Sequence, residues 1–173
     1  MVNGYGEERE ARRKALRLLE HMDRTEKGLR DKLIQSGFSE TVSEDAIAYV
    51  KDYGYINDQR YAFNYIMYRI HSKSRQKLFQ ELQQKGVSPQ LIQAAWEEAS
   101  ELEEPDERTL LRETIQKKCE PGDVLDDGAL RRLYGFLQRR GFRGSDIAST
   151  LEELNITRSN YNEHKIDKKC NQK

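Results

Sequence analysis

Apolar side chains recur along this chain at spacings of three and four residues, the pattern that predicts amphipathic helices. The fullest stripe holds Leu130, Leu133, Tyr134 and Leu137. Only three prolines and eleven glycines interrupt the 173 residues, and so few breaks favour helix over other structure. We therefore expect an all-α protein.

Three short stretches, LIQSGF, LQQKGV and LQRRGF, repeat along the chain. Each is typical of the last turn of a helix, followed by a glycine and an apolar residue. We expect Gly37, Gly86 and Gly141 to take the left-handed conformation that ends a helix, because glycine has no Cβ to clash there. The leucines that begin the stretches are 49 and 55 residues apart, which fits a repeated structural unit.

Each of these glycine-ended helices has one predicted helix before it and one after it. The sequence therefore predicts about nine helices, arranged as three tandem three-helix repeats. A unit of this size has little core of its own, so the modules should stack on their neighbours into an elongated, curved array. The predicted modules are residues 1–54, 55–103 and 104–155, and residues 156–173 are predicted to be a polar, flexible tail.

Charge is balanced over the whole chain but not along it. Hydrophobic residues make up 36%, charged residues 35%, and the formal net charge is zero, so no global field draws the protein to nucleic acid or membrane. The local net charge is +4 for residues 61–90, −8 for residues 91–128 and +5 for residues 129–173. Two basic regions therefore lie on either side of an acidic one.

The chain shows no pattern of catalytic or metal-binding residues. The two cysteines lie far apart, and the three histidines have no ligand spacing. There is no phosphate-binding glycine loop and no nucleophile with a base at a known spacing. Asp58 follows a predicted N-cap, where a carboxylate complements the helix dipole. We expect no catalysis, metal or cofactor and, without a signal peptide or a membrane-length apolar run, a cytoplasmic protein.

The stretch GYINDQRYAFNYIMYRI, residues 54–70, predicts a helix with two different faces. Asn57 is the expected N-cap. The aliphatic face should pack inside its own module. The tyrosine face should pack mostly against the preceding module, with stacking on bases or contact with a protein partner as the alternative. The aliphatic face holds Phe63, Ile66, Met67 and Ile70, the opposite face Tyr61, Tyr65 and Tyr68, and Arg60 and Arg69 lie between them.

The stretches LRDKLIQSGF, GYINDQRYA and QELQQKGV, in this order and spacing, resemble the RecX family, bacterial regulators of the RecA recombinase. The resemblance covers roughly residues 11–154 and is weakest in the third module. Two positions depart from the family pattern: Gly28 stands where a Glu is usual, and Ser74 where a Gly is common. The resemblance implies a helical-repeat protein without enzymatic activity that binds the RecA–DNA filament and modulates recombination, DNA repair and the SOS response.

With the basic regions, the resemblance suggests where a partner binds. Arginine forks suit phosphate and carboxylate groups, so RecA carboxylates and DNA phosphates are both expected partners. Two other hypotheses remain: a DNA-binding module that acts without RecA, and a scaffold that grips a peptide. We expect a monomer. The candidate residues are Arg60, Tyr61, Tyr65, Arg69, Lys73, Arg75, Lys77, Arg131, Arg132, Arg139, Arg140 and Arg143.

Overall fold

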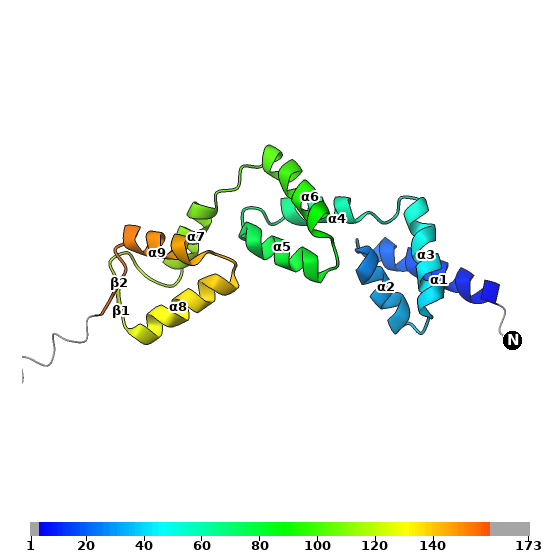
Figure 1. The fold of residues 1–173 in the computed structure, drawn as a ribbon, viewed down its shortest axis with the longest axis horizontal. Coiled ribbons are helices and arrows are strands. Elements are labelled where there is room, and N and C mark those ends of the chain that lie inside the picture. Colours follow the sequence, from blue (N-terminus) through cyan, green and yellow to red (C-terminus); the bar gives the residue numbers. More distant parts are fainter. Residues whose placement is uncertain (1–3, 160–173) are drawn as a thin grey trace, which may run out of the picture. The chain divides into compact units, whose positions relative to one another are not determined.

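A computed structural model describes residues 4–159 (Figure 1). Most of the predicted tail lies outside the described residues. Within residues 4–159 the chain forms nine α-helices and two strands of two residues each, so the all-α repeat fold is confirmed. The chain folds into two compact units: the first takes in the described parts of residues 1–70 together with 78–105, and the second takes in residues 71–77 together with the described parts of 106–173.

The first module consists of α1 (Gly4–His21), α2 (Glu26–Gln35) and α3 (Glu40–Asp52). Thr25 and Ser39 cap α2 and α3 by accepting backbone N–H groups with their hydroxyls. The core extends past α3, because Ile56 from the following connection is buried in it. The buried residues of this core are Ala11, Ala15, Leu29, Leu33, Ala46, Ile47, Val50 and Ile56.

The second module consists of α4 (Asp58–Met67), α5 (Arg75–Gln84) and α6 (Pro89–Leu102). Asn57 caps α4 as predicted: its side chain accepts the backbone N–H of Arg60 at 2.9 Å. The chain's single tryptophan, Trp96, is 8% exposed in this core. The predicted aliphatic face of α4 packs here, since all four of its residues belong to this cluster or contact it.

The third module consists of α7 (Glu107–Gln116), α8 (Asp127–Arg139) and α9 (Gly144–Glu153). A short parallel pair joins β1 (Val124–Leu125) to β2 (Thr157–Arg158). The sequence assigns residues 156–159 to the tail, but the structure makes them part of this module. Ile156 is buried in the core and the residues after it pair with β1.

The three repeated glycines end their helices as predicted. Gly37, Gly86 and Gly141 have φ values of 96°, 88° and 87°. In each case the glycine N–H and the next N–H donate to carbonyls of the last turn, as Phe38 does to Leu33 at 3.3 Å. These are Schellman ends, which satisfy carbonyls that a helix otherwise leaves without partners.

Within the first unit, the beginning of α2 meets the end of α5. The Thr25 hydroxyl donates to the backbone carbonyl of Lys85 at 2.6 Å. One residue on, the backbone N–H of Glu26 donates to a carboxylate oxygen of Asp58 at 2.9 Å. Asp58 therefore binds the beginning of a helix in the preceding module, in addition to its predicted place at the beginning of α4. Burial raises the pKa of its carboxyl above the ordinary 3.8.

The second unit contains the same joint between other residues. The Ser74 hydroxyl donates to the backbone carbonyl of Arg140 at 2.7 Å, and the backbone N–H of Arg75 donates to the Glu107 carboxylate. The Ser74 hydroxyl here makes the contact that the Thr25 hydroxyl makes in the first unit. Because the same hydrogen bonds recur one repeat further along, we treat this helix-end joint as a recurring feature of the fold.

Two of the three repeated glycines also allow close approach at these joints. A Cβ on Gly86 would lie 2.6 Å from Cδ of Lys27 and closer still to its Cβ. A Cβ on Gly141 would lie 2.8 Å from the backbone nitrogen of Lys77. Gly37 has nothing within 4 Å. At position 37 only the positive φ angle requires glycine. At positions 86 and 141 the positive φ angle and the close packing both require it.

Candidate partner-binding surfaces

The tyrosines of α4 do not lie opposite its buried face. Ala62 and Ile66 are fully buried, while Tyr61 and Tyr65 border them and are half-buried. Tyr68 is 85% exposed. The predicted tyrosine face is therefore divided between half-buried Tyr61 and Tyr65 and exposed Tyr68. The position nearest the core is taken by Ala62, to which the sequence pattern gives no role.

Tyr65 is held by contacts inside its own module. Its hydroxyl donates to the Glu81 carboxylate at 2.6 Å, and burial together with this bond raises the pKa of Tyr65 to about 12. The Arg69 guanidinium lies 4.0 Å from the ring centroid, and Tyr61 stacks at 6.1 Å. This is an ordered aromatic and cationic surface, half open to solvent.

Tyr61 packs against the core of its own module, although the sequence predicts packing of this face mostly against the preceding module, and it borders residues of the first module at one hollow. It lines a hollow of about 200 Å³ together with Arg24, Lys27 and Lys85. Lys27 already pairs with Asp31 at 2.7 Å. The buried Nε of Arg24 has no hydrogen-bond partner within the described part of the chain. The surface therefore carries more cations than the sequence pattern of α4 alone predicts.

The other candidates from the first basic region are divided between the units. Arg60 is exposed in the first unit, with its guanidinium 3.4 Å from the Gly54 carbonyl. Lys73, Arg75 and Lys77 belong to the second unit. The backbones of Arg75 and Lys77 take part in the helix-end joint, which is a structural role beside the predicted contact with phosphate.

The arginines of α8 form an exposed row. Arg132 and Arg139 lie back over glycines four residues earlier: their Nη1 atoms are 3.1 and 3.2 Å from where a Cβ on Gly128 or Gly135 would stand. The two glycines are seven residues apart, as are the two arginines, so all four share one helix face. Arg132 and Arg139 therefore form an exposed basic strip on the third module.

The remaining arginines of this region lie beside that strip. Arg140 stacks on Phe136 with its guanidinium carbon 4.7 Å from the ring centroid. Arg131 donates to the carbonyl of Asp127 at 3.1 Å. Arg143 is the N-cap of α9 and makes no side-chain capping bond. All of these guanidinium groups stay exposed.

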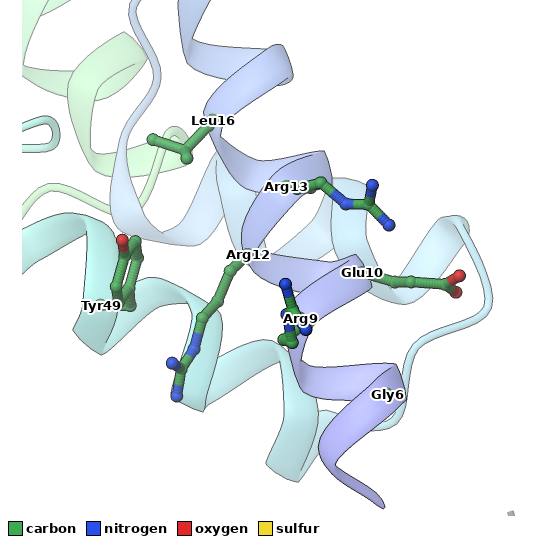
Figure 2. A pocket seen from close by; sticks show the side chains of 7 residues that line it. All are labelled: Gly6, Arg9, Glu10, Arg12, Arg13, Leu16 and Tyr49. Carbon is green, nitrogen blue, oxygen red and sulfur yellow. The ribbon is translucent and has the colours of Figure 1, made fainter. Parts of the chain in front are cut away.

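The first module also has a basic hollow that the sequence patterns do not predict. It has a volume of about 550 Å³ and is lined by residues of α1 and by Tyr49 of α3. Figure 2 shows Arg12 extending beside Tyr49, with Glu10 and Arg13 on the other side of α1. The sequence signal is the i, i+4 spacing of Arg9 and Arg13. The local net charge does not reveal it, because acidic residues nearly cancel the charge of this module.

Other functional groups are few among residues 4–159. No cluster of three His, Cys, Asp or Glu side chains there could hold a metal ion. No helix in that range has both the length and the apolar character needed to cross a membrane. Cys119 is half-buried, and burial raises the pKa of its thiol, which disfavours the reactive thiolate.

The fold and these surfaces define a helical-repeat protein whose conspicuous features are exposed arginines and tyrosines. Models of the first and the second three-helix domains of RecX match residues 11–49 and 57–95. The chain is 32% identical to the regulatory protein RecX of Caldanaerobacter subterraneus subsp. tengcongensis over 154 residues, which are 88% of this chain and 73% of that relative. It is 35% identical to the regulatory protein RecX of Trichlorobacter lovleyi over 143 residues, 80% of this chain and 92% of the relative.

A solved structure supports the same assignment of fold. The crystal structure of RecX from Lactobacillus salivarius aligns with a TM-score of 0.61 at 20% identity, over 87% of this chain and 98% of that one. The chain belongs to the RecX family.

Proposed function

We propose that this protein binds the RecA–DNA nucleoprotein filament and inhibits RecA recombinase activity, and so modulates recombination, DNA repair and the SOS response. The observation that carries the proposal is membership of a family whose relatives are named regulatory proteins. The protein acts by binding, without catalysis of its own.

The distribution of the cationic surfaces supports a partner with repeated subunits. One surface, around Tyr65 and Arg69, lies in the first unit. Another, the strip of Arg132 and Arg139, lies in the second. A filament offers the same protein and phosphate groups many times, so one chain can engage it at both surfaces. Linked contacts of this kind raise affinity well beyond that of either contact alone.

Inhibition follows if the bound chain favours one state of the filament. A ligand shifts an equilibrium only by its difference in affinity for the two states. A chain that bridges or wedges between neighbouring RecA subunits would favour the state in which RecA no longer extends or exchanges. RecA then leaves the DNA faster than it is replaced.

The test is RecA's DNA-dependent ATPase and strand exchange with stoichiometric amounts of this protein. We expect both activities to fall. The proposal is wrong if neither activity changes.

A matched pair of variants tests the second surface. Arg132→Ala with Arg139→Ala removes the basic strip, and we expect inhibition to need about two- to thirtyfold more protein, since exposed ionic contacts are worth about 0.2–1 kcal/mol each. Arg112→Ala is the control, because that exposed arginine is already paired with Glu153 at 2.8 Å in the same unit. Equal loss from both variants would refute a specific role for the strip.

A further inference from the structure

Three tyrosines at the end of α3 form a ladder that faces solvent. Tyr49 and Tyr53 have ring centroids 4.8 Å apart, and Tyr53 and Tyr55 stack at 6.3 Å with an interplanar angle of 27°. Tyr53 is 65% exposed and Tyr55 is 54% exposed. Single exposed tyrosines are common on proteins. Three in a row, with two of them largely open, make a surface that the core does not explain.

The backbone holds the ladder in place. Gly54 has a φ of 71° and ends α3, and the N–H of Tyr55 donates to the Val50 carbonyl at 2.9 Å. The next residue, Ile56, is buried in the core of the first module. Tyr53 and Tyr55 are thus fixed on both sides of a rigid turn, and a ligand loses little entropy in ordering them.

Arginines stand at both ends of the ladder. At the Tyr49 end the Arg12 guanidinium lies 5.0 Å from the ring centroid. The hollow of Figure 2 adds Arg9 and, on the side of α1 away from Tyr49, Arg13. Both are exposed, and neither has a carboxylate partner within the described residues. Arg60 lies at the other end, with its guanidinium 3.5 Å from the Tyr55 carbonyl.

The acidic groups on this face are partly neutralised. Asp45 accepts both hydrogen bonds of the Arg12 fork at 2.8 Å, and this contact lowers the pKa of the Asp45 carboxyl. Glu10 lines the hollow and Asp52 is exposed near the end of α3. Arg9 and Arg13 therefore remain the groups available to an anion.

We propose that this face of the first module binds a short stretch of single-stranded nucleic acid. Bases stack on Tyr53 and Tyr55, and backbone phosphates meet Arg9 and Arg13. Proteins that bind single strands stack the bases on open aromatic rings and hold the backbone with nearby arginines. This kind of stacking tolerates any base. A duplex hides its base faces, and an acidic peptide leaves the rings without a role. The site uses other residues than the filament surfaces proposed above and does not depend on RecA.

The test is fluorescence anisotropy of labelled dT and rU oligonucleotides with the full chain at low salt and without RecA. We expect binding that Tyr53→Ala with Tyr55→Ala weakens at least about tenfold, because base stacking on aromatic side chains dominates such sites. Arg9→Ala with Arg13→Ala should reduce the salt dependence by about 1.4 in log–log slope, from about 0.7 for each phosphate contact. Tyr68→Ala is the control, since Tyr68 is 85% exposed just after α4 in the same unit.

The outcomes separate this inference from the proposed function. Emission from the buried Trp96 checks that each variant keeps its fold. The inference is overturned if the tyrosine pair binds like the unmodified chain, if polyglutamate competes as well as an oligonucleotide does, or if the chain binds no single strand. In the last case filament inhibition can still hold. Single-strand binding without any effect on RecA would instead refute the proposed function alone.

Discussion

The helix-end joint makes a sharp prediction about glycine. Gly86→Ala and Gly37→Ala place the same methyl group at the same kind of helix end, with φ values of 88° and 96°. The new Cβ of Gly86→Ala would lie 2.6 Å from Cδ of Lys27, whereas that of Gly37→Ala would meet nothing within 4 Å. The two variants therefore differ only in the joint between α2 and α5.

Two costs, one from the backbone conformation and one from packing, set the expected losses in unfolding free energy. An L-residue in the left-handed region costs about 1–2 kcal/mol, and both variants carry that term. Overpacking by a methyl group costs about 1–3 kcal/mol more where the neighbour cannot move away. Lys27 Cβ is fixed to the backbone of α2, so only Gly86→Ala carries the second term. We expect losses in unfolding free energy of about 1–2 kcal/mol for Gly37→Ala and about 2–5 kcal/mol for Gly86→Ala.

Urea unfolding measures both values. Far-UV circular dichroism reports on the helices and Trp96 emission on the first unit, where both glycines lie. Gly54→Ala is a second control, since its φ is 71° and its Cβ would also meet nothing within 4 Å. Equal losses for Gly86→Ala and the two controls would show that the joint contributes nothing, and the reasoning would fail.

Two further variants test the hydrogen bonds of the same joint. Thr25→Val removes the hydroxyl that donates to the Lys85 carbonyl at 2.6 Å and should lower the free energy of unfolding by about 1–3 kcal/mol; Thr25→Ser should restore most of it, as urea denaturation would show. Asp58→Asn keeps an oxygen for the Glu26 N–H. Because the folded-state pKa of the Asp58 carboxyl is raised above 3.8, the unmodified protein loses stability as pH rises above 3.8 and through the folded-state pKa. The variant should therefore have the higher Tm near neutral pH and lose this advantage below about pH 4; a constant difference between the two Tm values would contradict the assignment.

Local signals account for what the sequence predicts correctly. A glycine after an amphipathic stretch, followed by an apolar residue, is enough to end a helix in one way. The cap Asn57 is equally local, since its side chain accepts an N–H three residues on. The repeat spacing then gives nine helices without any knowledge of tertiary contacts.

The joint and much of the surface depend on contacts that no local pattern encodes. Thr25 and Lys85 are 60 residues apart, so nothing near either one indicates the other. The sequence pattern places the tyrosine stripe of α4 too far from the core, because Ala62, a small residue, has a weak hydrophobic signal. No periodic pattern links Tyr53 to Tyr55, because a glycine in the left-handed conformation separates them and breaks the helical period.

The central claim is that this chain recognises assembled RecA. The most direct measurement is equilibrium binding at physiological salt to three targets: RecA assembled on single-stranded DNA with a non-hydrolysable nucleotide, RecA alone, and the bare strand. We expect clear preference for the assembled filament, with weaker binding to the bare strand through the first module. Binding to the filament no tighter than to the bare strand would contradict it.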